Sequence, residues 1–233
     1  MTRVRVVAAT AVLLALAGCG FGNPWPAVPP DVPAPIDVTL FGDSVMNGTG
    51  PFLHDGLTWY GQPSTVVDRS IIGSGLLDPG NHAYVESNLP ASGVVVFEYV
   101  GMCWGCPIPY GTFPFYVEWR AEMHTLITDA RNKGLRVVWV KPPPVANPFI
   151  APVTAALAPI VDEVTAQDGV VECDWWQALG DTNGSYQDWL WYQAVWQPPE
   201  AHLVRAGDGL HLSDDGRRRS AAWTAAAIMT AAA

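Results

Sequence analysis

The sequence is poor in charged residues, and basic residues are the scarcer kind. Charged residues make up 15% of the 233 positions, with 12 Lys and Arg against 22 Asp and Glu, and the formal net charge is −10. A protein that binds nucleic acid neutralises phosphates with a basic stripe, and the one basic cluster here, residues 217–219, falls on the solvent face of an expected helix. The composition therefore argues against nucleic acid as a partner.

Long hydrophobic runs are absent after the N-terminus. Residues 6–17 form an apolar run behind two arginines, which has the size of a signal-peptide core and is too short to span a bilayer comfortably. The run ends in Leu-Ala-Gly-Cys at 16–19, which resembles the lipobox of bacterial lipoproteins; an ordinary signal peptide cut nearby is the alternative. We expect residues 1–19 to be a lipoprotein signal peptide, and the protein to be exported, extracytoplasmic and anchored to the bacterial cell membrane by a lipid on Cys19.

Proline is concentrated before the folded part of the chain. Residues 20–35 contain six prolines, which favour extended polyproline II structure over a packed core. This segment is either a spacing stalk or a disordered linker. We expect a single domain over residues 36–233, since that length builds one substantial core.

Short β-rich runs alternate with helical ones from residue 36 onward. The expected strands are 36–42, 65–69, 94–100, 135–141 and 170–173, and the clearest helices are 115–132, one that follows Ala151, and 214–232. Strands separated by helices pair in parallel, because a parallel pair needs a crossover. The predicted fold is a three-layer α/β/α sandwich with a mainly parallel five-stranded sheet.

One segment, residues 174–208, does not fit this alternation. It holds many aromatic residues among Gly, Asn, Asp and Pro, and we expect a long loop or lid. Its tryptophans either present flat apolar surface to sugar rings or acyl chains, or cover the edge of the sheet as ordinary core.

Two short motifs carry the candidate chemistry. Ser44 follows the first expected strand in Gly-Asp-Ser, where a turn opens into a helix and presents a hydroxyl at the ligand crevice. Far downstream, Asp208 and His211 stand three residues apart, so that the carboxylate can orient an imidazole that takes the proton of a serine. The other histidines lack such a partner within a motif, and we expect His202 at the surface.

Together these motifs resemble blocks I and V of the SGNH (GDSL-like) hydrolases. The resemblance implies a flavodoxin-like sandwich, no metal or organic cofactor, and hydrolysis or transfer of acyl esters by Ser44, Asp208 and His211. No Gly-x-Ser-x-Gly elbow is present, which argues against an ordinary α/β-hydrolase. The family's second block implies that Gly75, or Gly73 if the alignment slips, donates to the oxyanion together with the Ser44 amide.

This sequence departs most from the family pattern in the third block. The run Glu-Tyr-Val-Gly-Met-Cys-Trp at 98–104 has no Asn, whose side chain donates to the oxyanion in the family, and loss of such a donor typically costs about 10²- to 10³-fold in rate. The amide of Gly101 or Met102, or the side chain of Asn147, could replace it.

Cysteine is scarce, with four in the chain. If Cys19 is lipidated, three remain, which permits one disulfide. Cys103 and Cys106 have the spacing of a redox pair, but prolines mark a loop there, so a structural bridge is favoured over a redox role. Zinc-finger spacing is absent.

The sequence therefore predicts a serine esterase that cleaves acyl or acetyl esters, on a small-molecule or glycan substrate, with no cofactor. Two alternatives stay open. One is an acyltransferase on envelope glycans, and the other is a non-catalytic envelope binding protein with a degenerate site.

Overall fold

The computed structural model describes residues 35–193 and 199–233. The expected signal peptide 1–19, its lipidation site Cys19 and all but the last residue of the linker 20–35 lie outside the described residues. Within the two described ranges, every helix is too short or too polar to traverse a bilayer.

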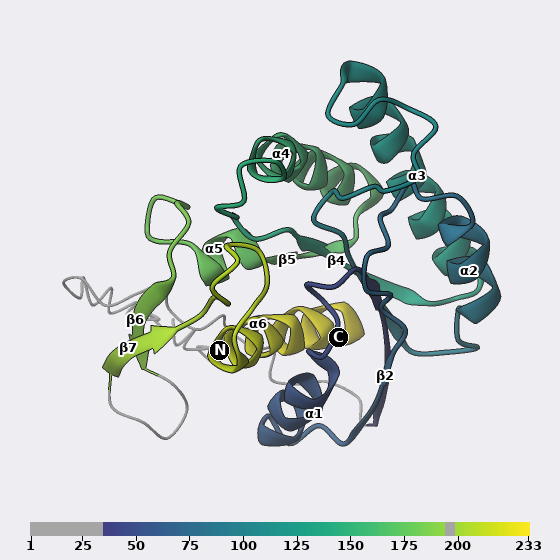
Figure 1. Cartoon of the computed structure of the whole chain (residues 1–233). Helices are drawn as coiled ribbons and strands as arrows, with labels where there is room; N and C mark the ends of the chain where they lie inside the picture. The colour runs from purple at the N-terminus through teal and green to yellow at the C-terminus, as the bar shows by residue number, and fades with distance from the viewer. Residues whose placement is uncertain (1–34, 194–198) are drawn as a thin grey trace, which may run out of the picture.

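Five parallel strands form the central sheet, in the order β2-β1-β3-β4-β5 (Figure 1). Their bounds are β1 (Ile36–Gly42), β2 (Ser64–Asp68), β3 (Val94–Glu98), β4 (Arg136–Lys141) and β5 (Val171–Asp174). The central strand β3 is buried at every position, as expected for a parallel strand that is covered on both faces. The predicted five-stranded parallel sheet is confirmed.

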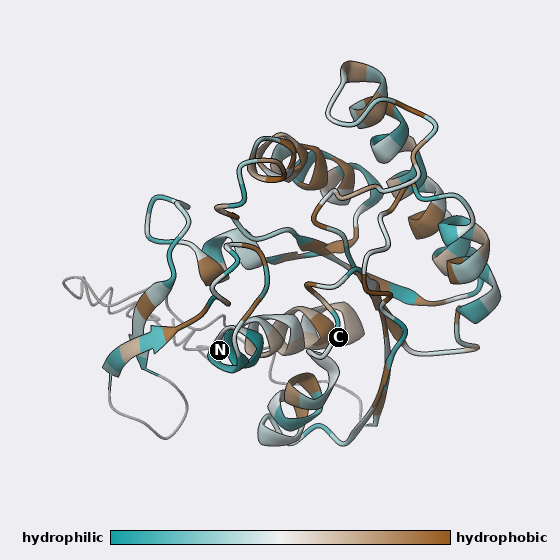
Figure 2. Ribbon diagram, in the orientation of Figure 1, coloured by the Kyte–Doolittle hydropathy of each residue, from teal (hydrophilic) through white to brown (hydrophobic). Residues whose placement is uncertain are grey.

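Helices cover both faces of this sheet (Figure 1). One face packs against α1 (Gly50–Trp59), α5 (Trp175–Leu179) and α6 (Asp214–Ala232), and the other against α2 (Asn81–Asn88), α3 (Phe113–Asn132) and α4 (Ala151–Asp168). Each layer has its own apolar core, and α4 is mostly hydrophobic along its length (Figure 2). The predicted three-layer sandwich is confirmed.

The strand order creates a topological switch point between β1 and β3. The chain leaves β1 toward β2 on one side and returns to β3 on the other, and in such sheets ligands bind at the carboxyl ends of the strands flanking the switch. Gly42 and Glu98 end the β1–β3 pairing at this place. A Cβ atom on Gly42 would lie 2.4 Å from the carbonyl oxygen of Glu98, so only glycine allows the two strand ends to approach this closely.

The segment 174–208 is more ordered than the long loop or lid that the sequence predicts. After α5 it forms an antiparallel ribbon of β6 (Trp189–Gln193) and β7 (Pro199–Leu203), and successive residues of β6 alternate between exposed and buried. This period-two alternation is the sequence signal of a strand. The tryptophans of this segment fall into two groups. Trp175 is fully buried in the core, whereas Trp189 and Trp191 are 58% and 49% exposed.

The last helix is attached to α5 by a buried polar contact. Trp175 Nε1 donates to Thr224 Oγ1 at 3.0 Å, and both side chains are fully buried. Thr224→Val is expected to lower the free energy of unfolding by about 1–3 kcal/mol, because the indole N–H loses its acceptor in an apolar environment. Urea titration measures the change. Thr230→Val on the exposed side of α6 is the control, and equal losses in both variants would contradict the prediction.

Candidate active site

Ser44 lies directly after β1, on a turn at the switch point. Asn47 N–H donates to the carbonyl oxygen of Asp43 at 3.1 Å, so the nucleophile turn is a single turn of helical type. The sequence predicts a helix opening at this serine, but α1 begins only at Gly50. Ser44 is half-buried and therefore reachable from solvent.

The side chain of Asp43 ties this turn to the end of β3. Asp43 Oδ1 accepts from Val45 N–H at 2.8 Å, and Asp43 Oδ2 accepts from Val100 N–H at 2.8 Å. These two bonds bring Ser44 and the loop after β3 together at the carboxyl edge of the sheet, where the sequence places the Ser44 hydroxyl. Burial raises the pKa of Asp43 to about 6, against the opposing effect of these two amides.

A second buried carboxyl, which the sequence analysis did not assign, faces Asp43. Glu98 is fully buried at the end of β3, and neither of its carboxyl oxygens has a hydrogen-bond partner among the described residues. Burial and then the nearby Asp43 charge raise the pKa of Glu98 well above its usual range. The two amides, in contrast, favour the ionised form of Asp43. One charged residue in an otherwise apolar strand was the signal for Glu98.

The residues of the two sequence motifs meet at this edge. His211 Nε2 lies 2.8 Å from Ser44 Oγ, and His211 Nδ1 lies 2.5 Å from Asp208 Oδ2. Because a carboxylate only accepts, Nδ1 carries the ring hydrogen and Nε2 accepts from the serine hydroxyl. Burial acts to raise the pKa of Asp208, but its bonds from His211 and from the backbone outweigh this effect and lower the pKa to about 2. Asp208 is thus ionised throughout the physiological range.

The loop that carries Asp208 and His211 is held at both ends. Ala206 N–H donates to the carbonyl oxygen of His211 at 2.9 Å, which closes the loop on itself. Just before it, Arg205 is fully buried and donates from Nη2 to the carbonyl oxygen of Pro144 at 2.6 Å, in the loop after β4. Burial lowers the pKa of Arg205 to about 10, which still leaves the guanidinium charged at neutral pH.

Gly75, which the family resemblance assigned to the oxyanion hole, has a different role. Its N–H donates to Asp78 Oδ2 at 2.6 Å, so the donor is already engaged in a turn. A Cβ atom on Gly75 would lie 1.7 Å from the carbonyl oxygen of Met102, which only glycine can avoid. The structure therefore corrects the assignment: Gly75 allows the loops after β2 and β3 to pack together.

Several backbone N–H groups in the loops around Ser44 are candidate oxyanion donors. Within the described part of the chain, the amides of Ser44, Gly101 and Met102 have no hydrogen-bond partner, and neither has that of Gly73, the alternative to Gly75. Gly101 adjoins Val100, whose own N–H binds Asp43 beside Ser44. Of the other candidate donors, Asn147 uses its Oδ1 atom to accept two backbone N–H groups before α4.

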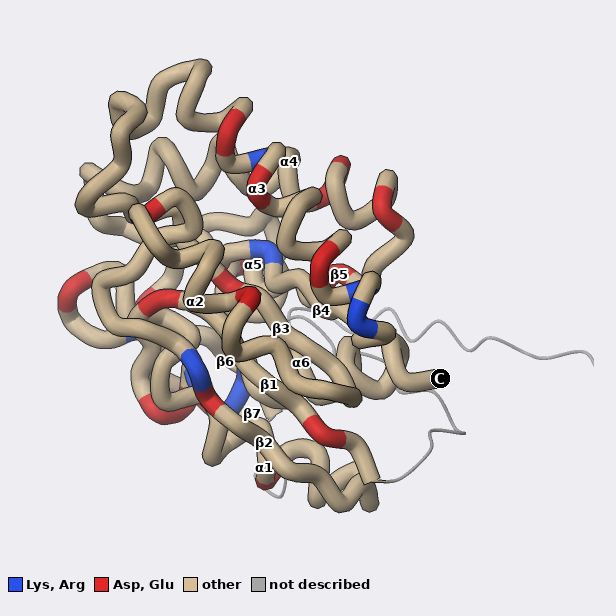
Figure 3. Tube along the Cα trace, turned by 90° about the vertical axis from the view of Figure 1, so that its right-hand side faces the viewer, with Lys and Arg blue, Asp and Glu red and all other residues tan. Residues whose placement is uncertain are grey.

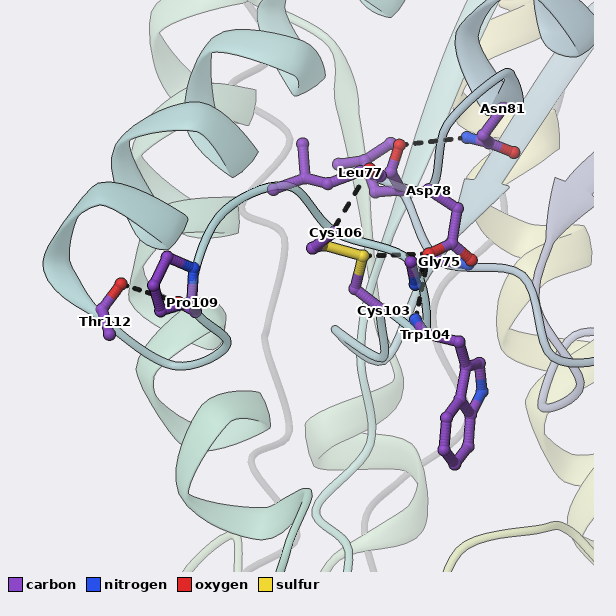
Figure 4. The surroundings of a disulfide bond; sticks show 11 residues. Gly75, Leu77, Asp78, Asn81, Cys103, Trp104, Cys106, Pro109 and Thr112 are labelled. Atoms are coloured by element: carbon purple, nitrogen blue, oxygen red, sulfur yellow. Dashed lines mark hydrogen bonds between the residues drawn. A yellow bond between two sulfur atoms is a disulfide. The ribbon is translucent and has the colours of Figure 1, made fainter.

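A disulfide joins Cys103 and Cys106, as the sequence favours, and Cys173 is a buried free thiol. Figure 4 shows the disulfide beside Asp78, whose Oδ1 accepts from the N–H of Trp104 at 3.0 Å. Among the described residues, this aspartate and the two cysteines are the one group close enough to hold a metal ion. Their sulfurs are bonded to each other, so the group lacks the thiolates that bind zinc. The disulfide closes a short turn in the loop after β3, and Asp78 connects that turn to the loop after β2.

His202 is buried, in contrast to the surface position expected from the sequence. It is 5% exposed, stacks on the ring of Tyr192 at 4.2 Å, and places Nδ1 3.2 Å from Asp215 Oδ2. Cross-strand packing in the β6–β7 ribbon, which was not expected, buries it. Its partner Asp215 belongs to α6, as predicted, and does not compete with Asp208 for His211.

The buried carboxyl pair makes the stability of the protein depend on pH. A carboxyl whose folded pKa is raised binds protons more tightly in the folded state, so the free energy of unfolding falls as pH rises above the ordinary pKa near about 4.3. Glu98→Gln removes this proton uptake. We expect its free energy of unfolding to increase relative to the wild type between pH 5 and 9, by at most about 1.4 kcal/mol per pH unit.

Urea titrations at successive pH values measure this difference. The exposed Glu86→Gln variant is the matched control and should follow the wild-type pH dependence. If the free energies of unfolding of Glu98→Gln and the wild type vary with pH in parallel, the pKa of Glu98 is not raised in the folded state.

Comparison with known proteins agrees with this architecture. The family model described as "Protein of unknown function (DUF459)" matches residues 105–226. None of the curated proteins matches this chain.

Several solved structures share the fold at low sequence identity. A lipase/acylhydrolase from Enterococcus faecalis has a TM-score of 0.61 at 16% identity, over 84% of this chain and 96% of that one. A GDSL-like lipase from Bacteroides thetaiotaomicron has a TM-score of 0.61 at 15% identity, over 84% and 88%. An acetyl xylan esterase from Geobacillus stearothermophilus has a TM-score of 0.60 at 14% identity, over 84% and 96%. The flavodoxin-like SGNH fold that the sequence resemblance implies is confirmed.

Proposed function

Because this chain belongs to the DUF459 family and has the SGNH hydrolase fold, we propose that it is a serine esterase that hydrolyses carboxylic esters. The observation that carries the proposal is the position of His211, within hydrogen-bond distance of both Ser44 Oγ and Asp208 Oδ2. A non-catalytic binding protein gains nothing from this arrangement. Structural neighbours named as acylhydrolases and an acetyl xylan esterase support acyl esters as the substrate class.

The proposed reaction proceeds in two steps. Ser44 Oγ attacks the ester carbonyl while His211 Nε2 takes its proton, and Asp208 stabilises the imidazolium that forms. His211 then protonates the leaving alkoxide, and an acyl group remains on Ser44. Water, deprotonated by His211, attacks this acyl-enzyme and releases the carboxylic acid. The unpaired amides of Ser44, Gly101 and Met102 supply the donors for the oxyanion.

Ser44→Ala and His211→Ala are each expected to lower kcat/KM for p-nitrophenyl butyrate by about 10³- to 10⁶-fold, because each removes a group that reacts directly. Hydrolysis is followed by release of p-nitrophenol, and a fluorophosphonate probe should label the wild type and fail to label Ser44→Ala. Ser87→Ala, at an exposed serine in α2, is the control. Equal turnover in all variants would refute the proposal, and labelling without turnover would favour acyl transfer to a specific acceptor.

We also propose that the protein is exported and lipid-anchored through Cys19, on the strength of the lipobox-like run at 16–19. Cys19→Ala is expected to abolish incorporation of radiolabelled palmitate in a bacterial host, because the thiol that accepts the lipid is lost. The control is Cys173→Ala, which removes a buried thiol. Palmitate labelling that persists in Cys19→Ala would contradict the anchor.

A further inference from the structure

Two loops at the carboxyl edge of the sheet contain no charged residue. They are residues 99–112 after β3 and 142–150 after β4, and the loop after β2 has its charged residues, Arg69 and Asp78, on either side of the uncharged run 70–77. Charged residues make up 15% of the whole chain, so these long uncharged runs set this edge apart. Figure 3 shows long tan stretches in the upper left part of the trace, interrupted by single acidic residues.

The same edge carries the most exposed large hydrophobic side chains of the described residues. Ile72 is 72% exposed, Trp104 is 72%, Phe113 is 80% and Phe149 is 68%. Ile72, Trp104 and Phe149 lie in the loops after β2, β3 and β4, respectively. Phe113 directly follows the loop after β3, at the start of α3. We call these four side chains the apolar rim.

Direct contacts connect the rim loops to one another and to the site around Ser44. Ile71 N–H donates to the carbonyl oxygen of Gly42, two residues before the nucleophile, at 2.9 Å. Phe149 stacks on Tyr110 with ring centroids 5.1 Å apart, which joins the loops after β3 and β4. Ala146 N–H donates to the carbonyl oxygen of Gly209, in the loop of Asp208 and His211, at 2.8 Å. The loops that carry the rim are therefore connected to the turn of Ser44 and to the loop of Asp208 and His211.

The rim is held rigidly by its own loops. The Cys103–Cys106 disulfide and the bond from Trp104 N–H to Asp78 fix the backbone on either side of Trp104. Figure 4 shows its indole extending away from the disulfide and from Asp78. An aromatic side chain kept exposed on a crosslinked loop loses little conformational entropy when it meets a partner.

We propose that the apolar rim docks on a lipid surface and delivers a long-chain acyl ester from that surface to Ser44. This inference rests on the proposed esterase function and narrows its substrate class to lipid esters. Side chains such as Trp and Phe partition into the membrane interface, and the uncharged loops that carry Trp104 and Phe149 approach hydrocarbon without having to desolvate charges of their own. A glycan would instead need several hydrogen-bonding groups, and among the four rim side chains only the Trp104 indole N–H is one.

The proposed anchor is compatible with this orientation. The linker enters at Ile36, the start of β1, and the site lies at the other end of that seven-residue strand, about 23 Å away at the usual rise per residue. Sixteen residues at 20–35 reach roughly 50 Å when extended as polyproline II. A domain anchored at Cys19 can therefore turn its rim toward the bilayer.

The first test compares soluble and membrane-embedded substrates for the full chain. Trp104→Ser/Phe113→Ser is expected to lower the rate of oleate release from dioleoylglycerol in phosphatidylcholine vesicles by about tenfold or more, and to leave hydrolysis of p-nitrophenyl butyrate within twofold of the wild type. Trp189→Ser/Trp191→Ser removes two exposed aromatics from the β6–β7 ribbon and should change neither rate. Equal loss on both substrates, no loss on vesicles, or the same loss in the ribbon variant would overturn the proposal.

The second test reads docking without turnover. In the Ser44→Ala chain, vesicles of brominated phosphatidylcholine are expected to quench part of the tryptophan emission, and that part should be lost in Trp104→Phe and kept in Trp189→Phe. The leader is common to every variant, so the difference isolates the rim. Quenching that Trp104→Phe leaves unchanged would refute the docking. If Trp104→Phe loses the quenching but the protein with Ser44 intact hydrolyses no ester, the result would support docking and refute the esterase proposal.

Discussion

The Asp43 carboxylate is the interaction on which the candidate site depends. Pairing between β1 and β3 ends at Gly42 and Glu98, and beyond that point the two chains diverge around the switch point. Asp43 accepts one N–H from its own turn and one from Val100, and so fixes the serine turn relative to the loop after β3. A buried carboxylate costs much free energy unless hydrogen bonds compensate it. Two amides provide this compensation, and the Asp43 charge raises the pKa of the neighbouring Glu98, which disfavours ionisation of both carboxyls at once.

A second buried charge positions the loop of Asp208 and His211, the other part of the candidate site. Arg205 precedes the loop of Asp208 and His211, and its guanidinium binds a carbonyl oxygen of the loop after β4 and lies over the ring of Tyr186, 5.3 Å from its centroid. The position of Ser44 and that of His211 are therefore set independently, one by a buried anion and the other by a buried cation. The 2.8 Å contact between them is the result of both anchors, and a shift of either loop by 1 Å would break it.

The sequence predicts the parts of this molecule that follow local patterns, and it fails where tertiary contacts decide. All five strands lie within two residues of their expected limits, and α6 has its predicted bounds, because apolar periodicity and a serine cap mark them locally. The ribbon of β6 and β7 was missed because its alternation is carried by Trp and Tyr among turn residues. Glu98 and Arg205 were not assigned, since their partners are distant in sequence. Gly75 was assigned by family resemblance, but its neighbour Asp78 takes the amide.

The loop after β3 contains no Asn, and its local structure limits which of its groups can act as donors instead. Gly101 has a φ of +95°, a conformation that favours glycine, and Cys103 is bonded to Cys106. Neither side chain supplies a donor, so a donor from this part of the loop must come from the main chain. Backbone amides held by the Val100–Asp43 bond have no rotamers to fix, whereas an Asn side chain must be ordered before it can donate. In the proposed mechanism, the N–H groups of Gly101 and Met102 therefore take the place of the Asn donor.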